Sequence, residues 1–130
     1  MPRMTYNTGA IDVHDLDFCE EGLCAVNTNF SCIISINEDY SFTPIWKPSF
    51  VSSIRAGDVC HLNGMAVENS KIKYVTALAK TDKPRAWTST VHKSEILIYY
   101  NSNEIVASEL EMPHSPRIYD GVLRLAISIA

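Results

Sequence analysis

The sequence predicts an all-β fold: a partial β-propeller of antiparallel four-stranded blades, of which the chain holds about two and a half. Three observations support this prediction. A strand module recurs along the chain, its apolar runs are short and β-branched, and each module contains residues suited to a hairpin turn. Helical repeats of similar length are the main alternative. The absence of helix-capping patterns argues against them.

A histidine opens each copy of the module. His14, His61 and His114 are separated by 47 and 53 residues, close to the length of one propeller blade. After each histidine come an apolar residue four positions on, a polar turn and a β-rich stretch. We place the modules at about residues 13–47, 61–109 and 114–130 of one partial domain that spans residues 1–130.

Strands can be assigned within each module. In the middle module we expect strands at residues 62–67, 72–78, 95–100 and 104–109. In the first module we expect them at residues 13–18, 23–28, 32–36 and 42–46, the last one shortened by Pro44 and Pro48. The third module supplies two strands. Because a propeller closes on itself, this half-built blade favours a fragment of a longer protein over a chain that pairs with a second copy.

Composition narrows the classes of partner and compartment. The net charge of -4, the pI near 5.5 and the scattered basic residues argue against nucleic acid or a membrane surface as partner. The N-terminus lacks the apolar stretch of a secretory signal, so we expect a cytoplasmic location. The four cysteines (Cys19, Cys24, Cys32, Cys60) contain no C-x-x-C spacing, and we expect them to be buried, reduced packing residues.

Four motifs resemble those of an uncharacterised conserved protein family, a domain of unknown function. They are Trp-Lys-Pro-Ser-Phe-Val at residues 46–51, Cys-His-Leu-Asn-Gly-Met-Ala at 60–66, Tyr-Val-Thr-Ala-Leu at 74–78 and Met-Pro-His-Ser-Pro-Arg at 112–117. The resemblance runs from about residue 13 to residue 125. It implies a propeller of several blades, and it brings no established activity with it.

The recurring histidines suggest a metal site. Residues at one repeat position of a propeller converge at a mouth of the central channel, so His14, His61 and His114 would meet there with Asp15 and Asn63. Imidazoles, a carboxylate and an amide oxygen are ligands for Zn²⁺, Mn²⁺ or Fe²⁺. The structural alternative stays open, because repeated polar residues can also join one blade to the next by hydrogen bonds.

A second, shorter resemblance concerns Asn63. Residues 61–67 loosely resemble the inner strand of gluconolactonase-type propellers, in which an asparagine just before a glycine is a metal ligand. Asn63 is the matching position, and the likeness covers that one strand.

Ligand-binding residues are expected on a loop of the middle module. The segment 79–93 is long for a connection between two strands, and such loops at a propeller rim often contact ligands. Arg85 and Trp87 are the candidates on this loop, and Arg117 in the third module is a further one.

Two functions remain open on the sequence. The first is a binding or scaffold module that uses one rim for a protein or a small molecule. The alternative is a metal-dependent enzyme, lactonase-like or lyase-like, in which the histidines hold an ion and a bound water acts as base or nucleophile. The sequence leaves open whether the chain is an enzyme, and a divalent metal belongs to the second hypothesis alone.

Overall fold

The computed structural model describes residues 13–36, 43–89, 95–110, 113–119 and 122–127 of the 130-residue chain. Antiparallel β-strands dominate these ranges, so the predicted all-β class is confirmed. The exception among the described residues is the short 3₁₀ helix η1, Ala86–Ser89. Within the same ranges, no helix has the length and apolar character needed to cross a membrane.

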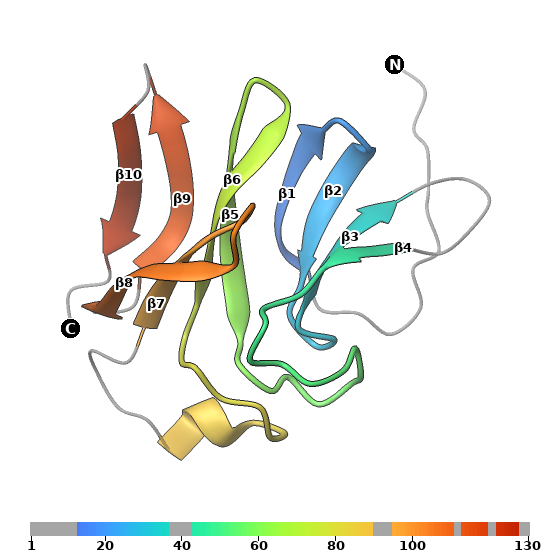
Figure 1. Ribbon diagram of the computed structural model, residues 1–130, viewed down its shortest axis with the longest axis vertical. Helices are drawn as coiled ribbons and strands as arrows, with labels where there is room; N and C mark the ends of the chain where they lie inside the picture. Colours follow the sequence, from blue (N-terminus) through green and yellow to red (C-terminus); the bar gives the residue numbers. More distant parts are fainter. Residues whose placement is uncertain (1–12, 37–42, 90–94, 111–112, 120–121, 128–130) are drawn as a thin grey trace.

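The strands form two four-stranded sheets and one hairpin (Figure 1). The first sheet has the order β1-β2-β3-β4, with bounds Val13–Cys19, Gly22–Asn27, Cys32–Ile36 and Thr43–Trp46. The second has the order β5-β6-β7-β8, with bounds Leu62–Glu68, Lys71–Ala77, Glu95–Tyr99 and Glu104–Leu110. The hairpin pairs β9 (Pro113–Tyr119) with β10 (Val122–Ile127). The strands of both sheets lie within one residue of the predicted ranges.

The residues at the turns explain the register of the β1–β2 and β5–β6 hairpins. Between β5 and β6 the chain reverses at Asn69 and Ser70, whose φ angles are 51° and 63°. A two-residue type I′ turn requires both angles to be positive, and asparagine adopts this region more readily than most residues. Between β1 and β2, Gly22 has a φ of 100°, which a residue without a Cβ adopts at little cost. These local preferences fix the pairing of both hairpins.

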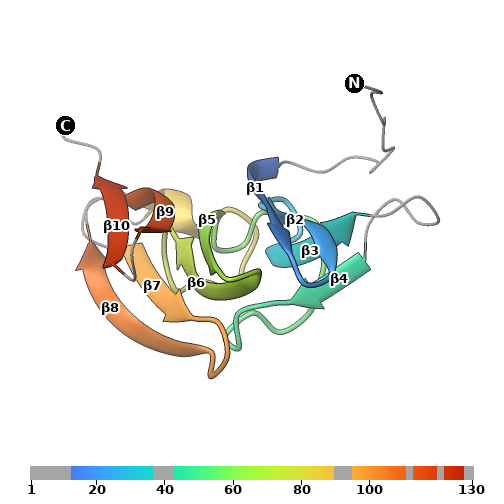
Figure 2. The ribbon, with the colours of Figure 1, turned by 90° about the horizontal axis from the view of Figure 1, so that it is seen from above.

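We call the two sheets and the β9–β10 hairpin the three units of the structure. Strand β5, the first strand of the second sheet, lies between β1 and β9, which are the first strands of the other two units (Figure 2). Two hydrogen bonds show that β1 and β5 run in the same direction. The amide of Met65 donates to Oδ2 of Asp15 at 3.1 Å, and the amide of Glu20 donates to the carbonyl of Ser70 at 2.8 Å. Both bonds join residues 50 positions apart. The second sheet therefore repeats the strand order of the first sheet about 50 residues later in the sequence. The hydrogen bond to the Asp15 carboxylate links the two sheets.

The main core lies between the two sheets. Its buried residues are Cys19, Cys24, Val26, Ile33, Val51, Val59, Cys60, Leu62, Met65, Ile72, Val75, Ala77, Ile96 and Ile98. At its edge Trp46 stacks on Tyr100, with ring centroids 5.4 Å apart, and its indole N–H donates to the Tyr100 carbonyl at 3.0 Å. Since apolar burial contributes roughly 25 cal/mol per Å², this shared core holds the sheets together as one unit.

Gly64 sets the distance between β5 and β9. A Cβ at this position would lie 2.4 Å from Cδ of Pro116 on β9 and 3.0 Å from Oγ1 of Thr76. The first distance is shorter than any real Cβ contact, and a proline ring cannot rotate away. Glycine is therefore required for the observed approach of the third unit.

Replacing Gly64 with alanine should lower the free energy of unfolding by roughly 1–3 kcal/mol, the usual cost of overpacking. Urea denaturation measures this loss. The Pro116→Ala substitution removes the clashing Cδ. The double variant should therefore lose less free energy of unfolding than the sum of the losses in the two single variants. Strictly additive losses would show that the two residues do not meet.

Candidate functional site

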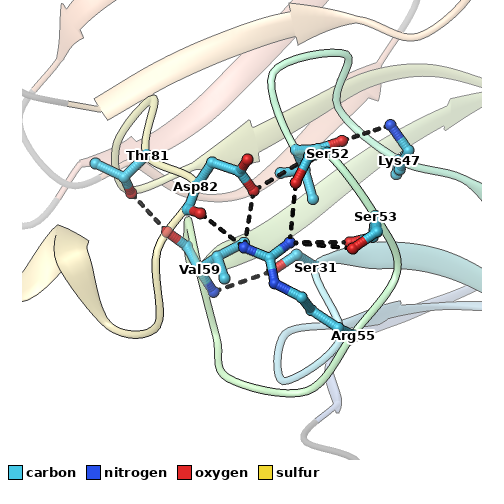
Figure 3. Close-up of polar contacts among 9 residues, drawn as sticks. Ser31, Lys47, Ser52, Ser53, Arg55, Val59, Thr81 and Asp82 are labelled. Carbon is cyan, nitrogen blue, oxygen red and sulfur yellow. Dashed lines mark hydrogen bonds and ion pairs between the residues drawn. The ribbon is translucent and has the colours of Figure 1, made fainter.

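Two loops meet where β5 begins. Residues 47–61 connect β4 to β5, and residues 78–89 follow β6 and end in η1. We call these two segments the loop platform; Figure 3 shows the polar contacts that join them. The loop platform carries three of the candidate residues from the sequence, namely His61, Arg85 and Trp87.

An ion pair and several hydrogen bonds cross-link the two loops (Figure 3). Nη2 of Arg55 lies 3.1 Å from Oδ1 of Asp82 and 2.7 Å from the Asp82 carbonyl oxygen. The same carboxylate accepts from the amide of Ser52 at 3.2 Å, and the hydroxyl of Thr81 donates to the carbonyl of Val59 at 2.6 Å. Hydrogen bonds from Ser52, followed by the hydrogen bond and the charge of Arg55, lower the pKa of Asp82. The two loops therefore form one connected surface.

His61 is held by a carboxylate and an indole ring. Its Nδ1 lies 2.9 Å from Oδ2 of Asp58, and its ring centroid lies 4.2 Å from that of Trp87. The indole N–H of Trp87 in turn donates to the carbonyl of Asp58 at 2.9 Å. A carboxylate beside Nδ1 keeps a proton on that nitrogen and fixes the orientation of the imidazole. Asp58 thus positions both rings.

Arg85 completes this cluster. Its guanidinium carbon lies 5.2 Å from the centre of the Trp87 ring, a cation–π distance, and its amide donates to the carbonyl of Gly57 at 3.0 Å. The φ angles of Asp58, His61 and Arg85 are 51°, 53° and 52°. Such angles cost a non-glycine residue of order 1 kcal/mol, and they concentrate at functional sites. Three of them in one cluster make the loop platform the main candidate site.

The loop platform is locally cationic on an acidic protein. The chain carries a net charge of -4, yet the side chains of Lys80, Lys83 and Arg85 are all exposed on one short segment. The acidic groups nearby are already engaged, since Asp58 contacts His61 and Asp82 pairs with an arginine. The charge that this segment presents to solvent is therefore positive.

Asp15 and Asn63, two of the predicted metal ligands, have partners of their own. The Asp15 carboxylate accepts a hydrogen bond from the amide of Met65, as described above, and Oδ1 of Asn63 accepts one from the hydroxyl of Thr76. The imidazole of His61 lies on the loop platform instead. Among the described side chains, these three candidates are each held by different residues. Asp15 links the two sheets through its hydrogen bond to Met65. This is the kind of structural role that the sequence left open as the alternative to metal binding by the histidines.

The strand register changes which positions are equivalent. Counting back five residues from the end of each inner strand gives His14 in β1, Asn63 in β5 and His114 in β9. Both His14 and Asn63 fall where the ladder shifts at a β-bulge. His61 precedes β5 and is not at this position. The side chains of His14, His114 and the candidate Arg117 lie outside the described part of the chain.

A buried polar cluster surrounds Asn63. The exposed fractions of Asn63, Thr76 and Glu95 are 5%, 0% and 1%. Among the described residues, neither oxygen of the Glu95 carboxyl has a hydrogen-bond partner, and neither does Nδ2 of Asn63. Burial raises the pKa of Glu95 to about 8, and the nearby Asn63 amide lowers it in part without reaching hydrogen-bond geometry. The Glu95 carboxyl is therefore largely protonated at neutral pH.

The expectation of four reduced cysteines is wrong for one pair. Cys19 and Cys24 form a disulfide across the β1–β2 hairpin, with Cα atoms 6.1 Å apart, a separation that a disulfide spans. The hairpin brings the two residues onto one face, which the C-x₄-C spacing does not reveal. Cys32 and Cys60 are free and buried, and burial raises the pKa of both thiols to about 12, as expected of inert packing residues.

Glu95 should make stability depend on pH. The folded protein keeps this carboxyl protonated up to about pH 8, whereas the ordinary pKa is 4.5, so folding takes up a proton between these values. The free energy of unfolding should fall across that window by at most about 1.4 kcal/mol per pH unit. The Glu95→Gln variant, which mimics the neutral acid, should lack this slope in urea denaturation. Parallel pH profiles for the two proteins would contradict the assignment.

The comparisons with known proteins identify a family. No curated protein matches the chain, and no solved structure does. The model of the family described as "Domain of unknown function (DUF4915)" matches residues 1–129, which confirms the resemblance to an uncharacterised domain family. Because this match covers nearly the whole chain, the protein belongs to that family.

Proposed function

We propose that this protein is a binding module of propeller-like architecture whose loop platform binds a small anionic ligand. The observation that carries the proposal is the cluster of His61, Trp87 and Arg85 on two cross-linked loops. Binding residues concentrate on loops that a rigid scaffold holds in place. The loop platform meets that description, because it extends from the start of the buried strand β5.

Repeated packing of sheets supports the propeller-like part of the proposal. The first strands β1, β5 and β9 lie side by side, as the inner strands of blades do. The face of the first sheet that is turned away from the second carries two cross-strand rows of apolar residues. These rows are Leu16–Ala25–Ile34 and Phe18–Leu23–Ile36. A sheet that has blades on both sides needs two apolar faces.

The charges of the loop platform support an anionic ligand. Arg85 presents a guanidinium, whose planar fork matches a carboxylate or a phosphate, and the exposed residues Lys80 and Lys83 belong to the same segment. Trp87 adds a flat apolar surface next to these charges. We therefore expect a ligand with a carboxylate or phosphate group attached to an apolar or planar part. A cytoplasmic location, where such metabolites are abundant, remains part of the proposal.

The alternative is a metal-dependent enzyme, lactonase-like or lyase-like. One observation favours it: Asp58 accepts from Nδ1 of His61, and metal-bound histidines commonly donate their second ring N–H to a carboxylate. We rank this function second, because the candidate ligands Asp15 and Asn63 already have hydrogen-bond partners within the fold.

Anion binding can be measured at the indole N–H of Trp87 by two-dimensional NMR. The Trp46→Phe variant distinguishes this signal from that of the other tryptophan. Inorganic phosphate and citrate serve as separate probes for the two anion types. We expect at least one of them to shift the Trp87 signal, and the Arg85→Gly variant to bind about tenfold more weakly or worse, because it loses a charge-assisted contact.

The Arg85→Gly variant should keep its fold. Its φ of 52° suits glycine, so stability should be unchanged or slightly higher. Lys71→Ala is the matched control, since Lys71 is an exposed cation at the other end of β5 and its loss should leave binding intact. A Trp87 signal that neither probe moves, or equal binding by the Arg85→Gly variant, would contradict the proposal.

A further inference from the structure

A second candidate site lies at the opposite end of β5 from the loop platform. The β1–β2 turn at Glu20 and Glu21 sits beside the β5–β6 turn, joined by the bond from the Glu20 amide to the Ser70 carbonyl. These turns border a pocket of about 220 Å³. Its lining residues are Glu20, Glu21, Ser70, Lys71, Ile72, Tyr100 and Asn101.

Three potential metal ligands lie close together near the β1–β2 turn, and one of them, Glu21, lines this pocket. Sγ of Cys19, Sγ of Cys24 and a carboxylate oxygen of Glu21 all lie within 4.8 Å of one another. Within the described residues, no other group of three or more histidine, cysteine, aspartate or glutamate side chains is this compact. Glu21 belongs to both features, because it lines the pocket and contacts the sulfur.

The position of Glu21 suits a reduced cysteine pair better than a disulfide. Oε2 of Glu21 lies 3.2 Å from Sγ of Cys19. A thiol can donate a hydrogen bond to a carboxylate, but a disulfide sulfur has no hydrogen to donate. A negative carboxylate at this distance is therefore stabilised when Cys19 carries a proton, or when a cation lies between sulfur and oxygen.

We propose that the reduced hairpin binds a thiophilic divalent cation, Zn²⁺ in particular, through the thiolates of Cys19 and Cys24 and the carboxylate of Glu21. A dithiol reductant opens the disulfide by supplying two electrons and two protons, and it becomes a disulfide itself. The cation then displaces both thiol protons to solvent. Two thiolates select zinc over magnesium and calcium, which prefer oxygen ligands.

The surroundings fit an open zinc site. Three protein ligands leave the fourth tetrahedral position for water or a ligand, and Glu21 faces the pocket that would supply it. Cys24 is fully buried and Cys19 is 7% exposed, so both residues are shielded from solvent. This site is independent of the loop platform, and either can fail alone.

Cobalt(II) is the probe for this proposal, because thiolate coordination produces charge-transfer absorption in the near ultraviolet. The full chain is reduced with a dithiol, freed of reductant without air, and titrated with Co²⁺ and then with Zn²⁺. We expect one Co²⁺ per chain with thiolate absorption, and its displacement by Zn²⁺. The Cys24→Ser variant should lose this absorption, and Glu21→Gln should weaken cobalt binding by about tenfold or more.

Two matched controls separate the site from its neighbours. Glu20→Gln changes the adjacent acid of the same turn and should bind Co²⁺ as the wild type does. Cys32→Ser removes a buried thiol outside the trio and should also leave binding intact. Circular dichroism checks that each variant is folded. The proposal is overturned if the folded, reduced chain shows no thiolate–cobalt absorption, if Cys24→Ser retains it, or if Glu21→Gln and Glu20→Gln bind equally.

Discussion

The close approach of two neighbours to strand β5 determines how the whole molecule is arranged. On one side the absence of a side chain at Gly64 admits Pro116 of β9, and on the other side the Asp15 carboxylate of β1 binds the amide of Met65. A buried carboxylate is costly unless it is hydrogen-bonded, so Asp15 favours one relative position of the sheets. The three units consequently follow one another through their first strands.

This arrangement leaves two ends of β5 where polar groups gather. At its start the loop platform holds His61 between Asp58 and Trp87, and at its far end Glu21 lies beside a cysteine pair. The middle of the strand is buried and apolar. Loop residues can change chemistry without disturbing such a core. The proposed anion site and the proposed zinc site are thus separate features of one scaffold.

Much of the fold follows from local sequence, whereas the sites depend on tertiary contacts. Strand ranges were predictable because apolar runs and turn residues such as Asn69 act locally. The common position of the histidines was inferred from spacing alone. His61 belongs to the loop before β5, whereas His14 lies within β1, and a count from the hairpin turns would have revealed this difference. The pairing of His61 with Trp87 joins residues far apart in sequence, so no local signal predicts it.

Native-state hydrogen exchange at the Met65 amide tests most directly whether β5 is the packed centre of the molecule. This amide donates to Asp15 from a fully buried residue. We predict that it exchanges only through global unfolding, with an opening free energy equal to that from urea denaturation. The amide of Arg85, on the exposed loop, should exchange through smaller local openings. If Met65 exchanges as readily as Arg85, the inner strands separate without unfolding and the account is contradicted.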